Sequence, residues 1–90
     1  MTQSITWKNA QVKHRTFTIA ARASGLDEAR RLAIGAIAAL VPQTLTEEEG
    51  EALLNWIYEK EPVFELDSSG VAQPGIAITE VNAGKRGWQE

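Results

Sequence analysis

Carboxylates are the most numerous side chains of this chain that could do chemistry, and they gather in one region. Residues 47–67 carry eight acids and a single base. Paired carboxylates act as general acid and base only where a cleft separates their pKa values. Glu48, Glu51 and Glu59 instead recur on the outer stripe of an expected helix, where water surrounds each side chain. We therefore predict a solvated acidic face, which can imitate phosphate charge toward a basic partner, and no catalytic pair.

The other residue types that could do chemistry form no catalytic or metal-binding set. His14 is the only histidine, and its cationic neighbours Lys13 and Arg15 repel a metal ion. The absence of Cys excludes disulfides, thiol nucleophiles and Cys-ligated metals. No P-loop, dinucleotide fingerprint or nucleophile-elbow motif is present. We expect no catalytic residue, no metal ligand and no cofactor, and hence a protein that is not an enzyme.

Basic and aromatic residues at the start of the chain suggest an alternative. Residues 1–31 carry six bases and two acids, whereas residues 32–90 carry three bases and ten acids. Aromatic rings can stack on nucleobases while Lys and Arg contact phosphates. The alternative prediction is therefore a small nucleic-acid-binding protein that uses its N-terminal hairpin. Its binding residues would be Trp7, Lys8, Lys13, Arg15 and Arg22.

The N-terminal third of the chain predicts a β-hairpin followed by a helix. Residues 4–8 form a short strand, residues 9–10 a turn, and residues 11–23 alternate like a half-buried second strand. A helix then runs to about Leu40, with Ser24 accepting hydrogen bonds from its first turn. Pro42 ends it.

The rest of the chain predicts a second helix and two more strands. Thr46 and Glu49 have the spacing of a capping box, and the inward face of the helix that follows is formed by Leu53, Leu54, Ile57 and Tyr58. Residues 62–67 and 75–81 read as strands on either side of a turn at residues 68–70. The whole predicts a single α+β domain over residues 1–90 in ββ-αα-ββ order. An antiparallel sheet carries the two-helix hairpin on one face, with an ordered core over about 4–82 and a flexible tail at 83–90.

Two further surfaces could meet a partner. The first helix is small and apolar on its outer side at Gly35, Ala38 and Ala39, which predicts either cover by another element or a homodimer contact. Trp56 flanks the apolar face of the second helix and can anchor a partner there. With Trp56, the predicted acidic binding face comprises Glu47, Glu48, Glu51, Glu59, Glu61 and Glu65.

In size and composition the chain resembles the accessory inhibitors carried by phages and other mobile elements, including anti-CRISPR proteins. The resemblance rests on a small, acidic, Cys-free chain without a catalytic set, and on no particular residue. It implies a protein-binding inhibitor that occludes a basic, nucleic-acid-handling complex through its acidic face. No apolar run is long enough to span a membrane and no secretory pattern opens the chain, so we expect a cytoplasmic protein and no membrane partner.

Overall fold

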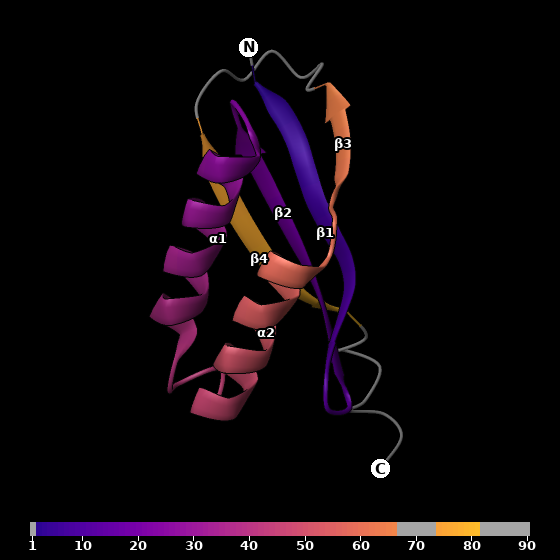
Figure 1. Cartoon of the computed structure of the whole chain (residues 1–90). Coiled ribbons are helices and arrows are strands. Elements are labelled where there is room, and N and C mark those ends of the chain that lie inside the picture. Colours follow the sequence, from indigo (N-terminus) through magenta and orange to yellow (C-terminus); the bar gives the residue numbers. More distant parts are fainter. Residues whose placement is uncertain (1, 67–73, 82–90) are drawn as a thin grey trace.

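The computed structural model describes residues 2–66 and 74–81, which form a four-stranded antiparallel sheet with two helices on one face (Figure 1). This confirms the predicted α+β class and the ββ-αα-ββ order. The turn predicted at residues 68–70 and the tail predicted at 83–90 lie outside the described residues. The elements are β1 (Gln3–Val12), β2 (Arg15–Ala23), α1 (Leu26–Leu40), α2 (Glu47–Glu59), β3 (Val63–Leu66) and β4 (Gly75–Val81).

The hairpin turn lies further along the chain than the sequence predicts. β1 continues through residues 9–10, and the chain reverses at Lys13 and His14 instead. Asn9 does adopt a positive φ of 59°, but it lies in a β-bulge, where the register of pairing with β2 shifts after Trp7. A residue with positive φ suits a turn or a bulge equally well, and the long-range pairing decides between them. The predicted turn at residues 9–10 is therefore wrong.

The start of α1 also differs from the prediction, whereas its end at Leu40 is confirmed. The residue that caps the helix is Gly25, and no side chain accepts a hydrogen bond from the first turn. Ser24 acts as a donor rather than an acceptor: its backbone N–H and its hydroxyl both bond to Oε1 of Glu28, at 2.8 and 2.9 Å. The charged carboxylate is the stronger acceptor and also suits the positive end of the helix dipole.

The predicted capping box of α2 is confirmed. The Glu49 N–H donates to Oγ1 of Thr46 at 3.1 Å, and the Thr46 N–H donates to Oε1 of Glu49 at 3.0 Å. Leu53 and Ile57 are fully buried, as predicted. Tyr58 is 61% exposed, so its place on the inward face is wrong. Ile57 lies at the centre of the buried stripe, and the next residue is turned about 100° toward solvent.

The strand order, which the sequence leaves open, is β3-β1-β2-β4, so the N-terminal hairpin forms the centre of the sheet. α1 packs over β2 and β4, and α2 packs over β1 (Figure 1). The other face of the sheet is covered by no described helix. The core between the layers contains Ile5, Trp7, Ala10, Val12, Phe17, Ile19, Ala21 and Ala23 from the sheet, Ala29, Ala33, Ile37, Leu53 and Ile57 from the helices, and Leu45 from the loop between them.

Candidate functional site

The structure divides the predicted acidic face between two separate surfaces. Some of the carboxylates lie beside the first turns of α2, and the others lie at its far end and along β3. Glu48 is held by Lys13, whose Nζ lies 2.8 Å from Oε1 of Glu48; this hydrogen bond raises the pKa of Lys13 and lowers the pKa of Glu48. Both side chains are largely exposed, so the pair adds little stability. All six predicted acids are exposed: Glu47, Glu48, Glu51, Glu59, Glu61 and Glu65.

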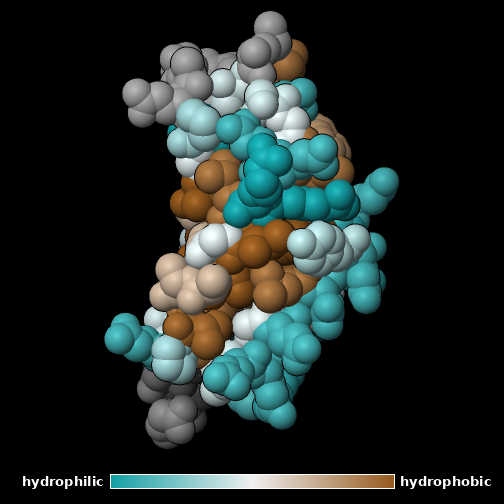
Figure 2. Space-filling model, turned by 60° about the vertical axis from the view of Figure 1, so that its left-hand side comes forward, coloured by the Kyte–Doolittle hydropathy of each residue, from teal (hydrophilic) through white to brown (hydrophobic). Residues whose placement is uncertain are grey.

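Glu47 and Glu51 lie beside an apolar groove between the two helices, which we call the interhelical groove. Its volume is about 470 Å³. Figure 2 shows apolar side chains gathered across the middle of the helical face, with hydrophilic groups around them. Neither carboxylate makes a hydrogen bond or an ion pair with another described residue. The apolar lining consists of Ile37, Ala38 and Val41 from the α1 side and Gly50 and Leu54 from α2.

Gly50 is the residue that brings the helices close together at the base of the interhelical groove. A Cβ atom added at Gly50 would lie 2.7 Å from Cγ2 of Val41, closer than a real contact. The predicted small face of α1 is exposed at Gly35, Ala38 and Ala39, and no described element covers it. Ala38 lines the interhelical groove, so this small face and the acids of α2 meet there. The dimer contact predicted at these residues stays a prediction.

The second surface, which we call the β3 edge, comprises Val63, Phe64, Glu65 and Leu66, the four residues of an outermost strand. All four are exposed. Glu59 and Glu61 precede it along the chain, so acidic groups lie close in sequence to its exposed apolar residues.

Trp56 is half-buried against the core and carries Lys60 Nζ 5.2 Å from its ring centroid. It lies two residues from Leu54, about 200° around α2, and therefore points away from the interhelical groove. The predicted anchor thus belongs to a different side of the helix from Glu47 and Glu51. The carbonyl of Lys60 accepts a hydrogen bond from the indole N–H of Trp7 at 3.1 Å, which fixes the chain just after α2.

An ion-pair cluster that the sequence did not predict joins the sheet to α2, and we call it the Arg15 corner. Arg15 donates two hydrogen bonds to the carboxylate of Glu80, at 2.9 and 3.0 Å. Its Nη1 donates to Oε1 of Glu49 at 2.9 Å and to the carbonyl of Thr44 at 3.1 Å. Its guanidinium also lies 5.0 Å from the ring centroid of Phe17. The Arg15, Glu49 and Glu80 side chains are at most 17% exposed, so the cluster is largely shielded from water.

The surroundings in the Arg15 corner favour the charged forms of Glu49 and Arg15. The backbone N–H of Thr46 is the largest cause that lowers the pKa of Glu49, and the charge of Arg15 adds to it against a cost of burial. The hydrogen bond to Glu80 likewise raises the pKa of Arg15. The sequence offered one signal: Arg15 alternates with Phe17 on the core side of its strand, and a cation on a core face needs a partner.

The residues of the predicted nucleic-acid surface do not lie together. Trp7 is buried under the helices, and Arg15 and Lys13 are engaged by carboxylates. Lys8 is exposed in the bulge of β1, and Arg22 lies on the sheet face away from the helices. The ring of Trp7 is thus not presented for stacking on a base.

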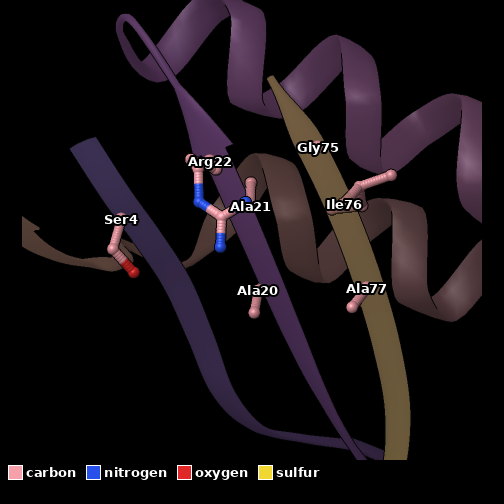
Figure 3. Close-up of a pocket in the computed structure, with 7 residues that line it drawn as sticks. All are labelled: Ser4, Ala20, Ala21, Arg22, Gly75, Ile76 and Ala77. Carbon is pink, nitrogen blue, oxygen red and sulfur yellow. The ribbon is translucent and has the colours of Figure 1, made fainter. Parts of the chain in front are cut away.

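Arg22 lines a hollow of about 340 Å³ on the uncovered face of the sheet. In Figure 3 its side chain extends over the strands toward Ala20 and Ser4, with Ala77 and Gly75 on the neighbouring strand. These small side chains leave the strand backbones close to the surface. Arg22 also makes an interaction within the protein, so it is not an unpaired cation.

No group of three or more metal-ligating side chains exists among residues 2–66 and 74–81. Nor does this part of the chain contain a helix long and apolar enough to cross a membrane. Comparison of the chain with protein-family models, curated proteins and solved structures returns no match.

Proposed function

We propose that this protein is a small non-enzymatic binding module that docks a basic partner protein on its helical face. The observation that carries the proposal is the interhelical groove of about 470 Å³, which has an apolar lining and is flanked by Glu47 and Glu51, whose carboxylates bind no other described residue. Apolar lining supplies affinity, and the carboxylates select for positive charge.

The occupant that fits this groove is an amphipathic helix of another protein. A third helix laid between α1 and α2 would bury its apolar stripe against Ala38, Val41 and Leu54. Lys or Arg at the flanks of that stripe would meet Glu47 and Glu51. If those cations normally hold phosphate, docking competes with nucleic acid, which is how a small acidic protein inhibits a nucleic-acid-handling complex. Such action in the cytoplasm agrees with the Cys-free composition.

The test uses a model peptide, a labelled amphipathic helix with a Leu stripe and Lys flanks. Amide NMR spectra of the protein titrated with this peptide are expected to change at Ala38, Gly50 and Leu54. The double variant Glu47→Lys/Glu51→Lys should weaken binding by about tenfold or more, since two attractive contacts become repulsive.

The matched control is Glu65→Lys, which makes the same charge change on the β3 edge and should leave the peptide affinity unchanged. Spectral changes that map away from the groove, or a double variant that binds as well as the wild type, would overturn the proposal. Labelled single-stranded DNA and RNA form a further arm of the titration. Salt-sensitive binding that is lost on replacing Lys8 and Arg22 would favour the nucleic-acid alternative instead.

A further inference from the structure

The large exposed apolar side chains of this protein are concentrated in one short segment. Within residues 2–66 and 74–81 they are Tyr58, Val63, Phe64 and Leu66, with exposures from 45% to 73%. Three of these four belong to β3, although most apolar residues of a domain this small are needed for its core. Exposed apolar groups gathered in one place mark an interaction surface.

β3 lies at an edge of the sheet, and its outer side pairs with no described strand. In an antiparallel sheet, alternate residues direct their N–H and C=O groups to either side, so an outer strand presents free donors and acceptors. At the opposite edge α1 packs over β4, whereas no described helix packs comparably over β3, so the side chains of β3 have less cover. An edge of this kind can accept one more strand.

The register with β1 assigns each residue of β3 to a face. Phe64 is paired with the buried Ile5, so Phe64 and Leu66 point to the helix-covered side. Glu65 is paired with Ser4 and therefore points to the uncovered side, as does Val63. An added strand would place apolar side chains beside Phe64 and Leu66, and a cation beside Glu65.

A second copy of this chain does not meet that requirement. Suppose that the β3 strands of two copies pair antiparallel in one continuous sheet. Placing Phe64 opposite Leu66 of the second copy then also places Glu65 directly opposite Glu65 of that copy. Like charges at directly opposed positions destabilise a sheet. Shifting the centre of pairing to Phe64 removes that clash but sets Val63 against Glu65. Glu59 and Glu61 add further negative charge to each copy.

We infer that the β3 edge is a second binding site, which takes up an extended segment of another protein with alternating basic and apolar residues. The segment pairs with the backbone of β3, its apolar side chains contact Phe64 and Leu66, and a Lys or Arg lies opposite Glu65. This site is separate from the interhelical groove and does not depend on it.

The test uses short labelled peptides and fluorescence anisotropy. One peptide alternates Lys with Val, and a second alternates Glu with Val. The wild-type protein is expected to prefer the Lys peptide by about fivefold or more, and Glu65→Lys should reverse this preference. A Lys–Val peptide with two adjacent Pro residues at its centre should not bind, because Pro cannot donate a backbone hydrogen bond.

Glu51→Lys is the matched control, because it makes the same charge change beside the groove and should keep the wild-type preference for the Lys peptide. The inference fails if the wild type binds neither peptide, binds both equally, or binds the Pro-containing peptide as well as the others. It also fails if sedimentation of the protein alone shows a dimer that Leu66→Lys disrupts, since a second copy would then occupy the edge. If the amphipathic-helix peptide does not bind in the groove but the wild type still prefers the Lys–Val peptide over the Glu–Val peptide, only the proposed function is refuted.

Discussion

The two ends of α2 lead into regions that differ in how their polar and apolar groups are satisfied. At its start, the Arg15 corner joins β2, β4 and α2 through a guanidinium that donates four hydrogen bonds to groups of the same chain. Beyond its end, the β3 edge exposes apolar side chains and one side of a strand. The polar groups of the first region bond to one another within the protein. In the second region, apolar side chains and the backbone groups along one side of β3 stay exposed among the described residues. Substitutions should therefore act on folding in one region and on binding in the other.

Removing the cation of the Arg15 corner should have the largest effect. Arg15→Met removes the shielded cation that binds both Glu49 and Glu80, so we expect a loss of about 3 kcal/mol in the free energy of unfolding. Urea denaturation measures it. The control is Lys13→Met, which breaks the exposed pair with Glu48 and should reduce the free energy of unfolding far less, because solvent screens that pair. Equal losses in both variants would show that the shielded ion pairs of Arg15 contribute no more stability than the exposed pair of Lys13 and Glu48.

Acid should weaken the same corner through Glu49. Its pKa is lowered in the folded protein by the Thr46 N–H and by Arg15, so its stabilising contribution is fully present above the ordinary Glu pKa. That contribution is lost as the pH falls through the lowered, folded-state pKa. Urea midpoints measured from neutral pH down to about pH 3 should therefore fall on acidification. Glu49→Gln keeps an acceptor for the capping box but loses the charge, so the decline should be shallower in this variant; an unchanged decline would contradict the assignment.

The sequence predicted the local features of both regions but not the contacts between distant residues. The capping box of Thr46 and Glu49 and the alternation of Arg15 with Phe17 depend on neighbours within a few residues, and both are confirmed. The partners of Arg15 lie 34 and 65 residues away, and no local pattern encodes them. The alternative prediction includes Trp7 as a nucleic-acid-binding residue, because nothing local shows that its strand is central and its ring buried.

The β3 edge could not be predicted for the same reason. Phe64 and Leu66 alternate like core residues, and only the position of their strand at the edge of the sheet leaves both exposed. A helix wheel likewise predicted the wrong side for Tyr58, because the width of the buried stripe depends on what packs against it. Burial and strand order are properties of the assembled layers, whereas caps and alternation are properties of the local sequence.

Two glycines extend the comparison from charges to packing. Gly50→Ala, close to the Arg15 corner, forces a Cβ against Val41, and we expect a net loss of about 1 kcal/mol despite the better helix propensity of Ala. Gly35→Ala, on the exposed side of α1, meets nothing within 4 Å and should stabilise the protein by about 0.8 kcal/mol. Thermal or urea unfolding of the two variants shows whether each substitution raises or lowers the free energy of unfolding. If Gly50→Ala also stabilised, the helices would not be in tight contact at the base of the groove.

The smallest effect on folding is expected at the β3 edge itself. Leu66 is 73% exposed, and Thr suits a strand, so Leu66→Thr should change the free energy of unfolding by less than about 0.5 kcal/mol. The same variant should weaken binding of the Lys–Val peptide, because it removes an apolar contact that only the added strand would bury. Urea denaturation and peptide titration of one sample separate the two quantities. A loss of stability comparable to that of Arg15→Met would mean that Leu66 belongs to the core, and the two ends of α2 would then no longer differ in what their side chains do.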